Sequence, residues 1–303
     1  MKVSTKKRKA KSNYEYALRV VQGRWVEGEA AIARSAKYSF LYARGIVCGP
    51  WRPGEAAIAK VAQYSCLYAC HVVRNPWLPG EKAIERSKRY LSQYSLFIER
   101  CMNDPRKAYL HAANVVKGRW RAGEAIIARN ASHSYSYASF ILKRRWKDGE
   151  PAISSCAETS FLYARDVAKG SWVPGEEAIS KDPYLSFQYA LEVVKGRWEK
   201  GEAAILKVPE YSYLYARDVL NGRWVKGEKT ILSDSFYSYL YAKYVLHGPW
   251  PEAEEGISLV PRLSYLYASE VIKGPFKLGE TAIWQDYCYK QEYKKNVLAE
   301  LPK

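Results

Sequence analysis

Ten glutamates recur along the chain at nearly constant spacing, and they are the first residues to examine for chemistry. Evenly spaced carboxylates could form the acid and base pairs that many hydrolytic reactions need. A glycine precedes nine of the ten, and an acid in the first turn of a helix suits the helix dipole, so we expect these residues to begin short helices. They are Glu29, Glu55, Glu81, Glu124, Glu150, Glu176, Glu202, Glu228, Glu254 and Glu280.

A large aromatic residue recurs with the same step and could serve either a ligand or a core. Exposed aromatics that stack on bases occur in single-strand binding proteins, but such platforms need only a few of them. A packing wedge is needed in every structural unit, so recurrence favours a buried core. The predicted core series is Trp25, Trp51, Trp77, Trp120, Trp146, Trp172, Trp198, Trp224, Trp250 and Phe276.

Other signs of catalysis or cofactor binding are weak. The four histidines form no metal-binding or catalytic motif, and no glycine-rich phosphate loop occurs. The six cysteines include no C-x-x-C pair, and Cys66 and Cys70 are expected to pack as small buried residues on one helix face. We therefore predict no enzyme, no metal site and no cofactor.

The spacing of these residues defines a repeat of 26 residues. In residues 211–234, apolar and tyrosine side chains fall on one broad face of a helix, and Asn221-Gly222 provides a stop that tolerates left-handed backbone. A second, shorter helix is expected to begin at Gly227-Glu228. Each unit is therefore a helix-turn-helix that can bury its apolar face only against its neighbours.

The fold class predicted is all-α, an α-solenoid of about ten such repeats with one truncated unit. Between Trp77 and Trp120 the spacing is 43 residues, because residues 87–104 lack the tryptophan and glycine-glutamate half. This irregular unit could be a hinge, or a fused helix that packs normally. The domains expected are a basic flexible tail at 1–13, the repeat array at 14–283 and a C-terminal capping helix at 284–303.

The phrases "YSYLYARDVLNGRW" and "GEAAI" carry a resemblance. They resemble the short helical repeats, rich in Tyr-Ala-Arg, of uncharacterised proteins from tailed phages and large DNA viruses. More distantly they are similar to tetratricopeptide-like arrays. The resemblance covers most of residues 14–283 and implies an α-hairpin solenoid without catalytic residues.

The charge of the chain indicates which partners it could attract. Lys and Arg outnumber Asp and Glu 48 to 31, a formal charge of +17. Cations on a mobile tail and at the turns between helices could contact phosphates or an acidic protein, or could simply form a solvated surface. The candidate contact residues are Lys6, Lys7, Arg8, Lys9, Lys11, Arg24, Arg119, Arg197 and Arg223.

These features predict a non-enzymatic helical-repeat scaffold that binds a macromolecular partner. A protein partner is favoured because solenoids expose extended surfaces, and nucleic acid bound through the basic tail and turn edge is the alternative. No apolar run is long enough for a membrane span, and the cysteine pattern indicates the cytoplasm, or the nucleus if the basic tail is an import signal. The oligomeric state stays open.

Overall fold

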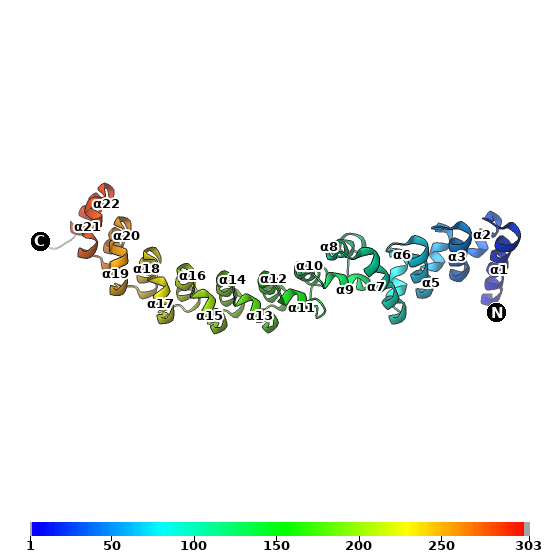
Figure 1. Cartoon of the computed structure of the whole chain (residues 1–303), viewed down its shortest axis with the longest axis horizontal. Coiled ribbons are helices and arrows are strands. Elements are labelled where there is room, and N and C mark those ends of the chain that lie inside the picture. The colour runs from blue at the N-terminus through cyan, green and yellow to red at the C-terminus, as the bar shows by residue number, and fades with distance from the viewer. Residues whose placement is uncertain (1, 300–303) are drawn as a thin grey trace. The chain divides into compact units, whose positions relative to one another are not determined.

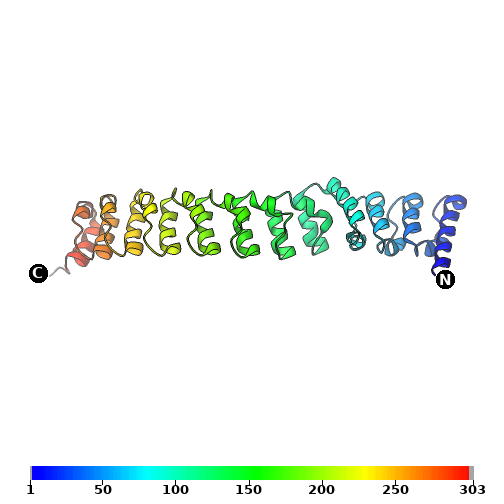
Figure 2. The same cartoon turned by 90° about the horizontal axis from the view of Figure 1, so that it is seen from below.

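The structure, a computed structural model, describes the backbone of residues 2–299 and the side chains of residues 9–299. Every regular element in residues 2–299 is a helix or helical turn, and consecutive helices pack as hairpins. The predicted all-α solenoid of short repeats is therefore confirmed. The chain divides into two compact units, unit 1 at Met1–Ala152 and unit 2 at Ile153–Lys303. Figures 1 and 2 show the successive hairpins within each unit.

Each regular repeat contributes a first helix, whose α-helical part ends at the repeated tyrosine or directly before it, and a second helix, which follows the tryptophan. The first helices of unit 1 are α1 (Lys2–Tyr16), α3 (Ala36–Tyr42), α5 (Ala62–Tyr68), α7 (Lys88–Met102), α8 (Pro105–Leu110) and α10 (Ala131–Ser136). Its second helices are α2 (Val26–Ile32), α4 (Arg52–Ile58), α6 (Leu78–Glu85) and α9 (Glu124–Ile127), and α11 (Glu150–Ser154) contains the unit boundary.

Unit 2 follows the same plan, with its first and second helices in two layers (Figure 1). Its first helices are α12 (Ala157–Tyr163), α14 (Pro183–Gln188), α16 (Pro209–Leu214), α18 (Ser235–Tyr241), α20 (Pro261–Leu266) and α22 (Tyr287–Tyr293). Its second helices are α13 (Val173–Ile179), α15 (Glu199–Ile205), α17 (Val225–Ile231), α19 (Pro251–Ser258) and α21 (Glu280–Gln285).

The first helices other than α7 continue into a π-helical turn before they stop, a feature that the sequence pattern did not predict. After α5 the turn Ala69–Val73 ends at Arg74, whose left-handed backbone (φ 57°) lets its N–H reach the carbonyl of Ala69 at 2.7 Å. In the predicted stop Asn221-Gly222, the left-handed residue is Asn221 (φ 52°) and not the glycine. The residues in this conformation are Gln22, Cys48, Arg74, Lys117, Lys143, Lys169, Lys195, Asn221, His247 and Lys273.

The second helices begin directly after the tryptophan, earlier than the sequence indicated. Helix α17 starts at Val225, so Gly227 lies in its first turn and does not begin it. The glycine is needed because the indole lies on it: a Cβ at Gly175 would come within 2.6 Å of the Trp172 ring and 2.7 Å of the Ser160 Cβ. In the one repeat without this glycine, Ala253 takes the position and is buried.

The irregular unit at 87–104 is a single helix, α7, and the alternative of a fused helix describes it better than a hinge. Tyr94 and Ile98 are fully buried, and α7 packs against α5, α6 and the 3₁₀ turn Arg121–Gly123. Helix α8 packs against α9, which directly follows that turn. The first helices α7 and α8 therefore pack on one and the same second segment, which consists of the 3₁₀ turn and α9.

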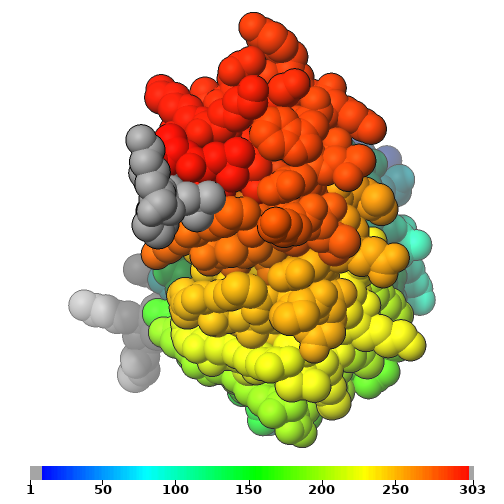
Figure 3. Space-filling model, turned by 90° about the vertical axis from the view of Figure 1, so that its left-hand side faces the viewer, coloured from blue at the N-terminus to red at the C-terminus, as the bar shows by residue number. Residues whose placement is uncertain are grey.

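The two ends of the array differ from the expected tail and cap. Residues 2–13, expected as a flexible tail, belong to α1, and Ala10 is already buried. At the C-terminus the cap is a further repeat, in which α22 continues into a π-helical turn, Lys294–Leu298, and buries Tyr293 and Val297. Figure 3 views unit 2 from this end, with the last repeat in red and orange. Leu301, expected in the cap, lies outside the described residues.

Among the helices of residues 2–299, none combines the length and the apolar character that a bilayer crossing requires.

Candidate functional site

The repeated tyrosine, glutamate and tryptophan form one hydrogen-bonded cluster in most repeats. The Tyr189 hydroxyl accepts the backbone N–H of Trp172 at 2.8 Å and donates to the Glu176 carboxylate at 3.1 Å. The Tyr189 ring packs on Trp198, with ring centroids 4.6 Å apart. One tyrosine therefore joins the second helix of one repeat to the tryptophan of the next. Equivalent hydroxyls bond both groups at Tyr42, Tyr68, Tyr94, Tyr137, Tyr241, Tyr267 and Tyr293.

The tryptophan series lies inside the array. Trp25 is half-buried, and the side chains from Trp51 to Phe276 are at most 8% exposed. The buried indole N–H of Trp51 makes no hydrogen bond of ordinary geometry, but it faces Glu29 of the preceding repeat and helps to lower the pKa of that carboxyl. The indoles are therefore not available to stack on a ligand.

The glutamates are also occupied by the fold, and their electrostatics depend on the residue before the tryptophan. Burial opposes ionisation of Glu29, but hydrogen bonds from Arg24 and Tyr42 outweigh it and lower its pKa. Glu81 is buried and has Pro76 where Glu29 has its arginine, so burial raises the pKa of Glu81. These carboxylates stabilise the array and form no exposed acid and base pair.

The four arginines predicted as contact residues all bind these glutamates. In each pair the guanidinium Nε lies 2.6–2.8 Å from one carboxylate oxygen, and the terminal nitrogen reaches the other. The pairs are Arg24 with Glu29, Arg119 with Glu124, Arg197 with Glu202 and Arg223 with Glu228. The guanidinium groups are partly exposed, but their charge is neutralised, so they are weak sites for an anionic partner.

The predicted cations of the tail lie on α1. Lys9 and Lys11 are exposed, and Lys11 Nζ lies 3.7 Å from the Glu15 carboxylate. The side chains of Lys6, Lys7 and Arg8 lie outside the described part of the structure.

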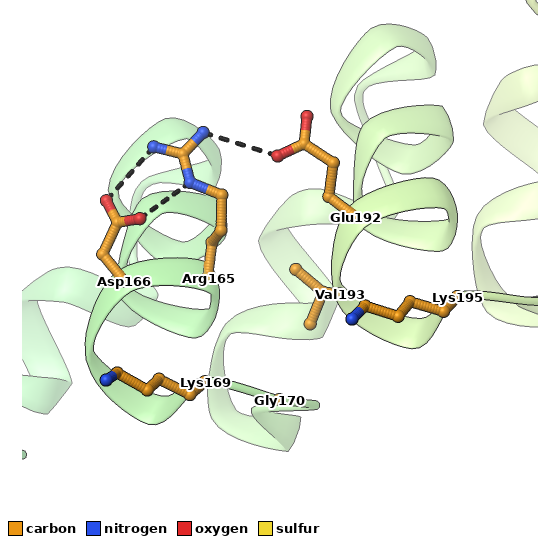
Figure 4. Close-up of a pocket in the computed structure, with 7 residues that line it drawn as sticks. All are labelled: Arg165, Asp166, Lys169, Gly170, Glu192, Val193 and Lys195. Atoms are coloured by element: carbon orange, nitrogen blue, oxygen red, sulfur yellow. Dashed lines mark hydrogen bonds and ion pairs between the residues drawn. The ribbon is translucent and has the colours of Figure 1, made fainter.

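The junction from first to second helix, which we call the turn edge, carries the left-handed residues and two shallow grooves. In unit 2 a groove of about 590 Å³ lies between α12 and α14, with Lys169 and Lys195 at its rim (Figure 4). Arg165 in this groove pairs with Asp166 at 2.8 Å and with Glu192 at 3.6 Å. The groove is therefore close to neutral.

In unit 1 the equivalent groove has a different charge. It has a volume of about 580 Å³ and is lined by Arg44, His71 and Arg74, among others. Gly45 and His71 stand where Asp166 and Glu192 stand in unit 2. The groove of unit 1 is therefore the more basic of the two.

The charge of the whole chain is in fact concentrated in unit 1. Unit 1 contains 29 Lys and Arg against 11 Asp and Glu, a formal charge of +18. Unit 2 contains 19 Lys and Arg against 20 Asp and Glu, a formal charge of −1. This division was not predicted from the sequence, although counting charges in each half of the chain would have shown it.

Much of the excess lies at the junction from the second helix of one repeat to the first helix of the next. Eight exposed cations there form what we call the basic edge: Arg34, Lys37, Lys60, Arg86, Lys88, Arg89, Arg106 and Lys107. None of the eight takes part in an ion pair within the described residues. Among the acids of this junction, Glu99 pairs with Arg129, Asp104 caps α8 beside Arg106 and Lys107, and Glu85 is the last residue of α6.

The same junction has another composition in unit 2. The first helices α14, α18 and α22 are capped by aspartates, Asp182, Asp234 and Asp286. Glu158 and Glu210 occupy the first turns of α12 and α16. Exposed aromatic side chains lie among these acids, namely Tyr184, Phe236 and Tyr287.

Comparison with known proteins gives no independent indication of function. No family model, no curated protein and no solved structure matches the chain. Within residues 2–299, no group of three or more His, Cys, Asp or Glu side chains is arranged to hold a metal ion.

Proposed function

We propose that the protein is a non-enzymatic helical-repeat scaffold that binds nucleic acid through unit 1. The observation that carries the proposal is the division of charge, +18 in unit 1 against −1 in unit 2. Clustered cations on a folded domain attract the phosphate backbone and release its counterions. A cytoplasmic location belongs to the proposal, because six free thiols suit a reducing compartment.

The scaffold part of the proposal rests on how the repeated polar groups are used. The tyrosine hydroxyl bonds the glutamate carboxylate, and in the repeats that have an arginine before the tryptophan the guanidinium bonds the same carboxylate, as Tyr42, Glu29 and Arg24 do. The repeated serine hydroxyls also bond within the array, since Ser186 Oγ donates to the carbonyl of Ile179 at 3.0 Å. What varies between repeats, and can therefore define a partner, is the exposed ends of the helices.

A protein partner, which the sequence favoured, is the second candidate and is supported by unit 2. Tyr184, Phe236 and Tyr287 are 50%, 46% and 78% exposed. Aromatic side chains are enriched at protein interfaces, and unit 2 lacks the excess positive charge that would attract nucleic acid. The two candidates are compatible because they use different units.

The nucleic-acid proposal is tested by equilibrium binding of the full chain. The probes are a fluorescent random-sequence DNA duplex of about 30 base pairs and a single-stranded RNA, titrated at salt concentrations from about 50 to 200 mM. We expect binding to at least one probe, with the logarithm of the association constant falling linearly against the logarithm of salt with a slope of about −4 or steeper. Absence of binding to both probes at about 50 mM salt would refute the proposal. If polyglutamate competed as strongly as unlabelled nucleic acid, the proposed partner would be an acidic protein and not nucleic acid.

A further inference from the structure

We infer that the basic edge is the surface of unit 1 that contacts nucleic acid, and that it binds the phosphate backbone without reading bases. This inference rests on the proposed function and assigns its surface. The alternative surface is the turn edge of the same unit, which carries exposed cations of its own. Three observations favour the basic edge.

First, helix stability does not account for four of the eight basic-edge cations. Lys37 lies in the first turn of α3, Lys88 and Arg89 in that of α7, and Lys107 in that of α8. The positive end of the helix dipole is at the N-terminus, so a cation is unfavourable there. Lysine at the turn edge, such as Lys117, follows the C-terminus of a first helix, where the dipole favours it. Lys117 thus has a structural explanation, and so have Arg34, Lys60 and Arg86, which follow the C-termini of second helices. The four cations named above in the first turns of first helices have none.

Second, the basic-edge cations are free to meet a ligand. All eight are exposed, and none is in an ion pair within the described residues. Arg24 and Arg119, at the opposite ends of the first helices, are held by glutamates. Within the described residues, however, Arg44, Arg74, Lys117, Lys143 and Arg144 of the turn edge are also unpaired, so pairing removes only part of the charge of that edge.

Third, the repeat itself does not require cations at these positions. Gln63 occupies in the third repeat the position that Lys37 occupies in the second. In unit 2 the same position holds one cation among six residues: Glu158, Tyr184, Glu210, Phe236, Arg262 and Cys288. Unit 2 folds with the same plan, so the cations of unit 1 serve something other than the fold.

The distribution of these cations suits a long phosphate backbone better than a single small anion. They follow the starts of consecutive first helices, and neighbouring packed helices lie about 8–10 Å apart. Their side chains are long and flexible, and the two shallow grooves lie at the other edge. The aromatic rings of Tyr38 and Tyr90 are half-buried beside Lys37 and Arg89. Phosphate contacts position a nucleic acid but carry no base sequence.

Two variants with the same change in charge separate the two edges of unit 1. The basic-edge variant carries R34Q, K37Q, K60Q, K88Q and R89Q. The control variant carries R44Q, R74Q, K117Q, K143Q and R144Q, all exposed residues of the turn edge. Glutamine suits both sets, because the chain itself has Gln63 at a basic-edge position and Gln22 at a left-handed turn position. Circular dichroism and thermal unfolding of both variants establish that each is folded.

We expect the basic-edge variant to bind the DNA duplex at least about 30-fold more weakly at about 100 mM salt, with a slope less steep by about 2 to 4. In the control variant this slope should change by less than about a third of that amount. Equal losses in the two variants would overturn the assignment of the edge and leave the proposed function standing. No binding by the unmodified chain would instead refute the proposed function. A dependence of affinity on base sequence, measured with three unrelated duplexes, would contradict recognition of the backbone alone.

Discussion

In eight repeats the indole rests on the glycine three residues later, and this contact limits the size of that residue. At Gly175 the Trp172 ring and the Ser160 side chain occupy the space that a methyl group would need. At Gly170, five residues earlier, an added methyl group would meet no atom within 4 Å. Packing therefore requires a glycine at position 175 but does not require one at position 170.

We predict that Gly175→Ala lowers the free energy of unfolding by about 1–3 kcal/mol, because the methyl group overpacks the contact with the indole. Alanine normally stabilises a helix relative to glycine by about 1 kcal/mol, so a loss of stability in Gly175→Ala would have to come from the crowded contact. Gly170→Ala is the matched control and should change stability by less than about 0.5 kcal/mol. Urea unfolding monitored by circular dichroism gives both values, and similar losses in the two variants would contradict the packing explanation.

The sequence predicted which residues of a repeat are structural, but not how their polar groups connect. Recurrence alone indicated that Trp172 and its counterparts are buried. The bond between Arg197 and Glu202 was missed, because both residues read equally well as independent surface charges. The tyrosine cluster was missed for a similar reason, since Tyr189 meets Trp172 and Glu176 only after the next first helix has packed.

At the scale of elements, the first helices share a row of buried tyrosine hydroxyls. Burial raises the pKa of Tyr189, Tyr241 and Tyr267 to about 12, and hydrogen bonds to the glutamates add to the effect. An unfolded tyrosine has a pKa of about 10. The folded array therefore holds these protons more tightly than the unfolded chain does.

The array should consequently lose stability in alkaline solution. Because the folded pKa is raised, the contribution of these tyrosines is fully present below about pH 10 and is lost as the pH rises toward about 12. We expect helical circular dichroism to fall in this window together with the rise in tyrosinate absorbance. Complete ionisation of tyrosine by about pH 11 with full helical signal would contradict the buried clusters.

The irregular element α7 should be as firmly held as the regular first helices. Tyr94 accepts the Trp77 N–H at 3.0 Å and donates to Glu81 at 2.9 Å, as in an ordinary repeat. We predict that amide hydrogen exchange around Tyr94 is as slow as around Tyr189. Exchange around Tyr94 faster by orders of magnitude would restore the hinge that the sequence left open.

The positions of the elements were predicted better than their ends. The 26-residue period located the hairpins, whereas the π-helical turns and the start of α17 at Val225 could not be read from it. A π-helical turn depends on two N–H groups, those of Lys195 and Gly196, reaching the carbonyl of Ala190. That geometry is set by packing between repeats, and no characteristic residue types mark it in the sequence.

At the scale of the whole chain, charge rather than the repeated motif distinguishes one unit from the other. The basic tail and the turn arginines were recognised in the sequence, because they are visible as a run or as members of the repeat. The basic edge was missed because most of its cations occupy two positions of the repeat, that of Lys37 and Arg89 and that of Arg34 and Lys60, which meet only at the helix junctions. Grouping exposed cations by helix end and by unit is what identifies it.

Protection of lysines from acetylation by bound DNA tests the central claim most directly. The full chain is treated with an amine-reactive acetylating reagent with and without a DNA duplex, and each lysine is quantified by mass spectrometry. We predict strong protection of Lys37, Lys60 and Lys88 in unit 1, and none of Lys207, which holds the position of Lys60 in unit 2. Equal protection of Lys60 and Lys207, or protection confined to turn-edge lysines such as Lys117 and Lys143, would contradict the account.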